Sequence, residues 1–137
     1  MASRGCAPTL PPVTEGEART FLMQWWDGVW HGGDIGLIDE LMADTYVQHS
    51  TRGNAVLDRQ KFKELMVQYQ RVLHGPVTTI DDFTVDGDKL WLRATSKGVN
   101  LETNAVSIVT WLLVYRFEEG HLAEGWVATI PDVDWNA

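Results

Sequence analysis

The segment from Trp30 to Thr51, WHGGDIGLIDELMADTYVQHST, constrains the fold most, because its signal changes from turn to helix to strand within one short stretch. The glycines at 32–33 permit a sharp reversal of the backbone, and Asp34 is a typical N-cap. Apolar residues then recur at helical spacing over 35–42. After them the period becomes that of a strand, which carries His49. The segment therefore predicts a short helix that leads directly into a strand.

A longer helix precedes this segment. Thr14 and Glu17 form a capping box, in which each side chain bonds the other residue's backbone N–H group. Apolar residues follow at helical spacing. They are Ala18, Phe21, Leu22, Trp25 and Val29, widened by Trp26 and Trp30. This stripe is too broad for a simple surface helix, so it predicts a buried one, with Trp25 in the core.

A third helix follows the segment. Residues 52–58 are expected to form a loop, and Asp58 can cap a helix over 59–73. His74 in its last turn is expected to bind the terminal carbonyl groups and to complement the helix dipole.

The remainder of the chain has the period of strands. Strands are expected at 77–85, 89–98, 104–117 and 121–130, with hairpin turns at Asp86–Gly87–Asp88 and Glu118–Glu119–Gly120. Helices followed by an antiparallel meander indicate an α+β domain with helices on one face of the sheet. The third of these strands is apolar on both faces. Its outer side should therefore also be buried, and we predict a homodimer through that face.

Composition narrows the possible partners. A chain of 137 residues fits one domain, which we expect over 14–137 after a disordered N-terminal arm over 1–13. The net charge of −8 argues against nucleic acid and against anionic membranes, which both require clustered Lys and Arg. The single cysteine, Cys6, cannot form an internal disulfide, which favours a cytoplasmic protein. The four histidines share no metal-ligand spacing, so no metal is predicted.

The order of residues around His49 resembles a known family. Trp30, the Gly33–Asp34 pair, the short apolar helix, Tyr46–Val47 and His49 are similar to the opening of the SnoaL-like polyketide cyclases, in the NTF2-like superfamily. The resemblance spans about residues 14–130 and continues in YRFEEG over 115–120 and in Trp126. It implies a cone, in which three N-terminal helices pack on a curved antiparallel sheet around a hydrophobic pocket.

The resemblance also implies a class of activity. Such a chain is expected to be a cofactor-independent lyase or isomerase that moves a proton next to a carbonyl of a polyketide- or terpenoid-like substrate, leading to cyclisation, isomerisation or dehydration. His49 is the first candidate for the acid or base, since imidazole titrates near neutral pH. Arg93 is the candidate that stabilises an oxyanion, and Tyr46 is a secondary candidate acid. The alternatives are that His49 fixes a turn, Arg93 is solvated and Tyr46 packs in the core.

The expected walls of the pocket are mostly aromatic and apolar. They are Trp26, Trp30, Trp126, Val47, Trp111 and Leu113. An aromatic wall suits a flat, hydrophobic ligand, although each of these side chains also suits ordinary core or sheet packing.

The chain departs from the catalytic sets of relatives in the same superfamily. The positions that resemble those of ketosteroid isomerase hold Trp26, Ser50 or His49, and Leu113, and those that resemble limonene epoxide hydrolase hold Thr95, Lys97 and Ala128. Both of those reactions are therefore disfavoured. The neighbours of Trp126 are Gly125 and Val127, where many SnoaL-like cyclases have an acid or a histidine. The alternative to an enzyme is a non-catalytic ligand-binding or dimerisation module with the same pocket.

Overall fold

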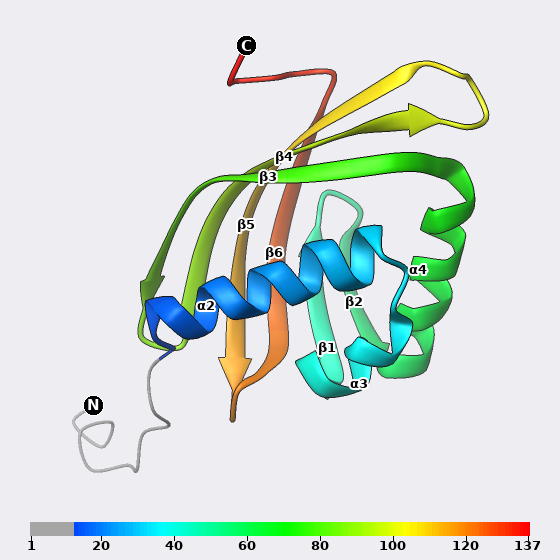
Figure 1. Ribbon diagram of the computed structural model, residues 1–137. Coiled ribbons are helices and arrows are strands. Elements are labelled where there is room, and N and C mark those ends of the chain that lie inside the picture. The colour runs from blue at the N-terminus through cyan, green and yellow to red at the C-terminus, as the bar shows by residue number, and fades with distance from the viewer. Residues whose placement is uncertain (1–12) are drawn as a thin grey trace, which may run out of the picture.

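The computed structural model describes residues 13–137, apart from the side chains of residues 72–76, and has helices on one face of a curved six-stranded sheet (Figure 1). Residues 1–12 of the predicted arm and the side chain of His74 lie outside the described residues. The helical elements are α2 (Glu15–Leu22), the π-helix η1 (Met23–His31), the 3₁₀ turn η2 (Ile35–Leu37), α3 (Ile38–Leu41) and α4 (Arg59–Val72). This arrangement confirms the predicted α+β class.

The first helix begins as its sequence predicts. The hydroxyl of Thr14 accepts from the backbone N–H of Glu17 at 3.1 Å, and the Glu17 carboxylate accepts from the backbone N–H of Thr14 at 3.0 Å, which confirms the capping box. The helix continues without a break from α2 into η1, whose wider π-helical turns carry the tryptophans. Trp25 is 1% exposed, as a core residue should be.

The short second helix differs from its prediction at its start. Asp34 precedes η2, but its side chain makes no capping hydrogen bond, so the predicted N-cap role is wrong. The reversal depends on the backbone instead. Gly33 adopts a positive φ of 69°, and the N–H of Asp34 donates to the carbonyl of Gly28 at 3.0 Å. The chain thus enters α3 through a 3₁₀ turn rather than through a side-chain cap.

The sheet is mixed. Its strands are β1 (Met42–Ser50), β2 (Gly53–Asp58), β3 (Leu73–Asp86), β4 (Lys89–Asn100), β5 (Val106–Glu118) and β6 (His121–Pro131), in the order β2-β1-β6-β5-β4-β3. Neighbours pair antiparallel except β1 and β6, which run parallel. This one pair corrects the expectation of a purely antiparallel sheet.

The segment expected as a loop over 52–58 is the edge strand β2. Its sequence, GNAVLD, does not alternate between apolar and polar residues as a half-buried strand does. Both faces of this strand are largely exposed at the edge of the sheet, so neither face requires apolar residues. Its backbone pairing with β1, rather than burial, makes it a strand. At its end the Asp58 carboxylate accepts from the N–H of Lys61 at 2.7 Å, which confirms the predicted cap of α4.

The meander from β3 to β6 confirms the predicted order of strands and turns. However, α4 ends at Val72 and β3 begins at Leu73, so the backbone of His74 belongs to a strand and its predicted place in the last turn of the helix is wrong. The β3–β4 hairpin turns at Gly87, with φ of 61°, and the β5–β6 hairpin turns through Glu119 and Gly120, with φ of 51° and 80°. In the β5–β6 turn, positive φ at both central residues gives a twist that matches the strands it joins.

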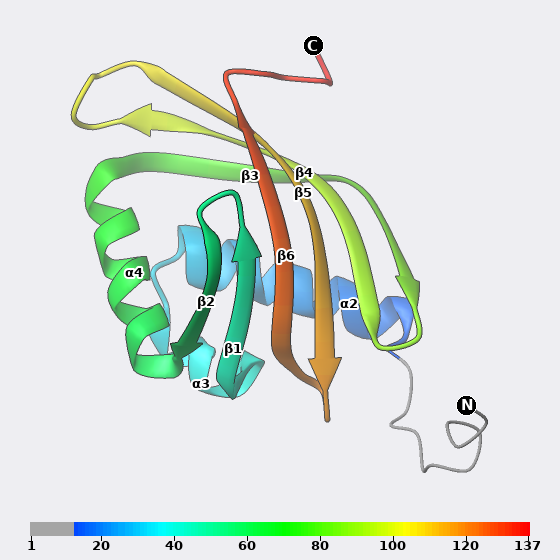
Figure 2. The ribbon, with the colours of Figure 1, turned by 180° about the vertical axis from the view of Figure 1, so that it is seen from behind.

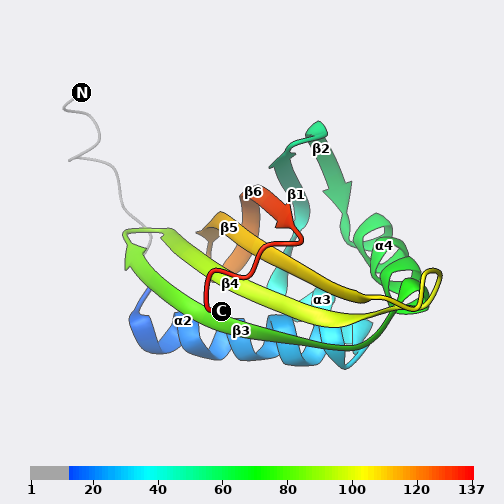
Figure 3. The same ribbon diagram turned by 90° about the horizontal axis from the view of Figure 1, so that it is seen from above.

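The helices cover only one face of the sheet. We call the face against α2 and η1 the inner face and the opposite one the outer face; seen from behind, no helix lies over the outer face (Figure 2). Viewed from above, the sheet curves around the helical side (Figure 3). The core fills the inner face, whereas Leu112 on the outer face of β5 is 39% exposed. The predicted burial of the outer side of β5 is therefore not achieved within a single chain.

Candidate functional site

The sheet separates the residues that the sequence analysis selected into two groups. Alternation along the strands directs Tyr46 of β1 and Trp111 and Leu113 of β5 to the inner face. It directs His49 of β1 and Trp126 of β6 to the outer face, together with Val47 and Arg93. The expected single site thus consists of two separate regions.

A cavity of about 260 Å³ lies between the inner face and the helices. Its lining residues come from η1, β1, the β1–β2 turn, α4, β5 and β6. They are Trp25, Trp30, Tyr46, Gln48, Ser50, Thr51, Arg52, Phe62, Trp111, Tyr115, Val127 and Thr129. The rings form the buried part, and the exposed turn residues Thr51 and Arg52 mark the opening to solvent. The cavity is therefore an aromatic chamber with a polar mouth.

Two phenols line the buried part of this cavity. The indole N–H of Trp25 donates to the hydroxyl oxygen of Tyr115 at 3.2 Å, which leaves the Tyr115 proton available to an acceptor. Burial raises the pKa of Tyr115, and burial together with the nearby Tyr115 and Glu124 raises the pKa of Tyr46. Both phenols therefore remain protonated hydrogen-bond donors at neutral pH.

Gly125 on β6 leaves room for the Tyr46 hydroxyl. A Cβ atom at position 125 would collide with that oxygen and would lie 3.1 Å from the ring of Tyr115. The sequence analysis noted Gly125 only as a position without an acid. Its place against both phenols explains why a side chain does not fit there.

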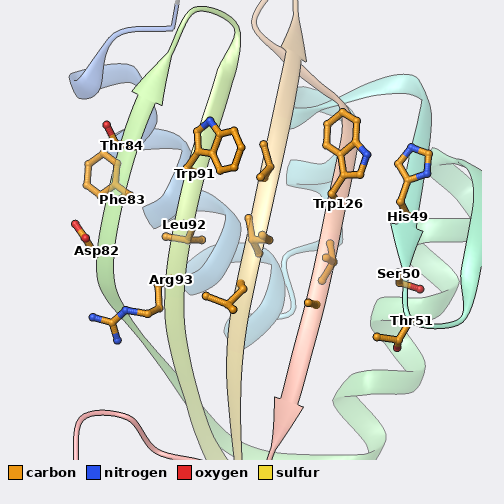
Figure 4. Close-up of a pocket in the computed structure, with 15 residues that line it drawn as sticks. His49, Ser50, Thr51, Asp82, Phe83, Thr84, Trp91, Leu92, Arg93 and Trp126 are labelled. Atoms are coloured by element: carbon orange, nitrogen blue, oxygen red, sulfur yellow. The ribbon is translucent and has the colours of Figure 1, made fainter.

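His49 lies outside the cavity, which corrects the expectation that its ring opens into the indole-walled space. Its Nε2 is 2.6 Å from a Glu124 oxygen, and its Nδ1 is 2.7 Å from the Asn54 side-chain oxygen. Its ring stacks on Trp126 with centroids 5.2 Å apart (Figure 4). The hydrogen bond to Glu124, followed by that to Asn54, raises the pKa of His49. Both ring nitrogens are therefore already bonded to protein side chains, which leaves neither of them free to contact a substrate.

Arg93 and Trp126 also differ from their expected positions. The Arg93 guanidinium lies on the outer face, 3.4 Å from a carboxylate oxygen of Asp81 and 3.4 Å from the side-chain oxygen of Asn136. Trp126 is 38% exposed beside His49 rather than in the cavity wall. Lys97 on the same face is exposed and pairs with Asp134 at 2.8 Å. The resemblance implied that Arg93 and Trp126 contact a ligand in the cavity, and the structure contradicts this because neither residue lines it.

Of the two η1 tryptophans expected in the pocket wall, Trp30 lines the cavity and Trp26 does not. Trp30 lines the cavity and meets the ring of Trp111 at 5.6 Å. Trp26 is 2% exposed and packs behind both rings, at 5.2 Å from each. Of the two, Trp30 is the one that a ligand in the cavity would contact.

The sequence analysis missed Tyr115, Gln48 and Arg52 as cavity residues. Tyr115 was noted only as part of a family motif, although it shares the parity of Trp111 on the same strand. Gln48 shares the parity of Tyr46 in the same way. Alternation could have found both, whereas the position of Arg52 depends on the unpredicted strand β2.

The profile of the SnoaL-like domain matches residues 22–125, which is most of the chain. The protein belongs to the SnoaL-like domain family. No curated protein matches the sequence.

Solved structures share the fold of this SnoaL-like protein. A candidate polyketide cyclase from Acidithiobacillus ferrooxidans is 22% identical, covers 85% of this chain and 88% of its own, and has a TM-score of 0.74. IdmH from Streptomyces antibioticus is 22% identical over 83% of this chain and 91% of its own, with a TM-score of 0.66. An LEH-like epoxide hydrolase from M. tuberculosis is 14% identical over 84% of each chain, with a TM-score of 0.68. At these identities the likeness establishes the NTF2-like cone.

A candidate metal cluster and a membrane-spanning helix are both absent from the described residues. No cluster of three or more His, Cys, Asp or Glu side chains able to hold a metal ion occurs among them. In the same part of the chain, no helix has both the length and the apolar character needed to cross a membrane.

Proposed function

We propose that the cavity binds a compact, hydrophobic, ring-containing carbonyl compound and promotes its cyclisation, isomerisation or dehydration without a cofactor. In this proposal Tyr46 and Tyr115 donate hydrogen bonds to the substrate carbonyl, while Trp30 and Trp111 hold its ring. The observation that carries the proposal is the pair of protonated phenols in the buried, aromatic part of the cavity. The membership of the SnoaL-like family supports the general class.

Hydrogen-bond donors in a water-excluded site stabilise the negative charge that develops on a carbonyl oxygen. Removal of one such donor typically lowers kcat by about 10²- to 10³-fold. The donors here are neutral, so they impose no cost of burying a charge in the aromatic chamber. The hydrogen bond from Trp25 positions the hydroxyl of Tyr115, and the hydroxyl of Tyr46 packs directly against Gly125. Both oxygens are therefore positioned before a substrate binds.

The volume of the cavity limits the substrate. Small-molecule sites usually enclose about 300–1,000 Å³, and this cavity of about 260 Å³ lies just below that range. A compact molecule with few rings fits, whereas a long polyketide would extend through the mouth past Thr51 and Arg52. We therefore favour a small ring system, with any polar or anionic group near Arg52.

The second candidate function is ligand binding without turnover. One observation favours it: the described residues that line the cavity include no carboxylate and no imidazole, so no side chain of ordinary basicity is available to accept a proton. A reaction at this site must then rely on polarisation of the carbonyl and on holding a reactive conformer. A cyclisation that forms its ring bond within the substrate and transfers no proton to the protein depends most on these two effects, and it is the reaction that we favour.

The experiment uses 1-indanone, a compact aromatic ketone, as a probe of the cavity. We expect saturable quenching of tryptophan fluorescence and a lowered carbonyl stretching frequency for the bound ketone, since a hydrogen bond weakens the C=O bond. Tyr46→Phe should lose part of that frequency shift. His49→Gln, which changes the outer face, is the matched control and should retain it.

Failure of 1-indanone to bind, or an unchanged carbonyl frequency in Tyr46→Phe and Tyr115→Phe, would contradict the polarisation proposal. Turnover then separates the two candidates. Carbonyl compounds that bind would be incubated with wild type and with Tyr46→Phe, and product formation that the variant loses supports the enzyme. Binding with a shifted carbonyl but no product from any of them supports the binder.

We also propose that a second copy of the chain covers the outer face. A groove of about 650 Å³ crosses this face, with Trp91 and Trp126 among its lining residues (Figure 4). Trp91, Leu112 and Trp126 are 49%, 39% and 38% exposed. Its rim is polar, with Asp82 and Arg93 at one end and His49 at the other. An apolar centre with a polar rim is the usual anatomy of a protein interface.

Light scattering after size exclusion tests the proposed dimer. Leu112→Glu should dissociate it, because a carboxylate at the centre of the interface loses its water. Val106→Glu is the control, since Val106 is exposed at the far end of β5 and outside the groove. A wild-type monomer at all concentrations would rule the dimer out.

A further inference from the structure

A chain of hydrogen bonds connects the end of η1 to the cavity wall. The Nε2 of His31 is 2.6 Å from the hydroxyl of Thr78 on β3, which is 2.6 Å from the hydroxyl of Ser96 on β4. The indole N–H of Trp111 on β5 donates to the same Ser96 oxygen at 2.8 Å. Trp111 lines the cavity, whereas His31 does not. The chain therefore extends from a half-buried titratable group to a ring that faces the cavity.

The direction of these hydrogen bonds is determined at one end. Trp111 can only donate, so Ser96 accepts from it. Each hydroxyl has a single proton. If Ser96 donates to Thr78, then Thr78 donates to His31, and Nε2 must be the unprotonated nitrogen. Protonation of Nε2 forces Thr78 to accept from His31 and to donate to Ser96. The hydroxyl proton of Ser96 can then no longer be donated to Thr78.

The surroundings of His31 favour its neutral form. Burial lowers the pKa of His31, and Asp27 on the same helix opposes this effect. The other elements packed around this chain contribute the hydroxyls of Thr78 and Ser96 and the indoles of Trp26 and Trp111, none of which carries a charge. The Nδ1 atom is buried and has no partner among the described residues. A proton added here would thus find no carboxylate in direct contact.

We propose that His31 is a positioning residue of the cavity: through Thr78 and Ser96 it holds the indole of Trp111 in the orientation that forms the cavity wall, and its protonation reverses the direction of the hydrogen bonds that support this hold. This inference concerns the same site as the proposed function, but it makes a claim about the empty protein. Trp26 reinforces the coupling, because it stacks on His31 at 6.2 Å and contacts Trp111 at 5.2 Å.

The test is a pH titration followed by NMR of the ligand-free protein. The indole N–H resonance of Trp111, assigned with Trp111→Phe, should shift with the same midpoint as the ring protons of His31, below the ordinary histidine value. In Thr78→Val the shape is kept but the hydroxyl is lost. His31 should still titrate there, while the Trp111 resonance no longer follows it.

The matched control is Thr79→Val. Thr79 neighbours Thr78 on β3 but is exposed and takes no part in these bonds, so this variant should keep the coupling. His31→Gln, whose side-chain amide can also accept from Thr78, should keep the Trp111 resonance near its neutral-pH position and lose its pH dependence. A purely structural histidine would not make an indole on β5 follow its protonation. A Trp111 resonance that is independent of His31 in wild type, or that still follows it in Thr78→Val, overturns the inference.

A binding measurement then relates the inference to the cavity. If 1-indanone binds, Thr78→Val should weaken it by about 2- to 10-fold, the usual effect of one hydrogen bond, and Thr79→Val should not. Equal affinity of Thr78→Val and wild type would overturn the positioning role. Coupling of His31 to Trp111 in a protein that does not bind 1-indanone would contradict the proposed function alone and would still support the inference.

Discussion

The inner cavity and the outer groove are built on the same strands, yet they give the same residue types opposite environments. Trp25 is 1% exposed and donates to a buried phenol, whereas Trp126 is 38% exposed and stacks on an imidazole. His31 behind the cavity has a lowered pKa, and His49 at the groove has a raised one. The comparison teaches that the parity of a residue along its strand, more than its type or its motif, decides its chemistry.

The largest difference should appear when the two tryptophans are truncated. Trp25→Ala removes a fully buried ring and should lower the free energy of unfolding by about 3–5 kcal/mol. Trp126→Ala removes an exposed ring stacked on His49 and should cost about 0.5–1.5 kcal/mol. Urea denaturation at low protein concentration, where self-association contributes least, measures both. Equal losses would mean that the two faces do not differ as described.

A smaller change at Gly125 probes the space on the inner face. Gly125→Ala adds a methyl group against the hydroxyl of Tyr46 and should destabilise the protein by about 1–3 kcal/mol, the usual cost of overpacking. Removal of that hydroxyl in the double variant Gly125→Ala/Tyr46→Phe should recover part of the loss. Gly16→Ala in α2 is the control, because nothing lies within 4 Å of its added Cβ. A fully additive double variant would show that the hydroxyl is not the obstacle.

The two histidines should give stability opposite dependences on pH. The folded pKa of His49 is raised, so its stabilisation is complete below about 6.5, the unfolded value, and is lost as pH rises through its folded pKa. The folded pKa of His31 is lowered, so stability falls as pH drops from about 6.5 toward that lower value, where the unfolded chain binds more protons. NMR titration gives the two pKa values. Unfolding of His49→Gln and His31→Gln across this range should remove one dependence each, and a shift of both pKa values in the same direction would contradict the contrast.

The smallest effect is expected from the pair of the exposed Lys97 and the partly buried Asp134. The hydrogen bond from Lys97 lowers the pKa of Asp134, but water and salt screen the attraction. Lys97→Ala should therefore change the free energy of unfolding by no more than about 1 kcal/mol. A larger loss in a thermal or urea melt would show that the C-terminal residues stabilise the outer face more than this pair suggests.

Local rules predicted most of the fold from the sequence. The capping box at Thr14, the cap at Asp58 and the hairpin turns at Gly87 and Gly120 depend on nearby residues, and the structure confirms them. The strand β2 could not be predicted in this way. Its residues are exposed, and only its pairing with β1 defines it.

The site was less predictable because it depends on which face of the sheet each strand presents. Alternation within β1 correctly separates Tyr46 from His49, but it does not say which of them faces the helices. The choice of His49 followed from its pKa near neutrality and from a resemblance. The contact with Glu124, seventy-five positions away in the chain, could not be read from local sequence.

The parallel pairing of β1 with β6 has a consequence for how the chain is made. β1 ends at Ser50, and its partner begins at His121, so one side of the first strand stays without its neighbour until the residues of β6 have left the ribosome. Contacts between such distant segments also form slowly, since a long loop must close before they contribute. Nascent chains that stop before residue 121 should therefore expose the unpaired edge of β1 and require chaperones to remain soluble.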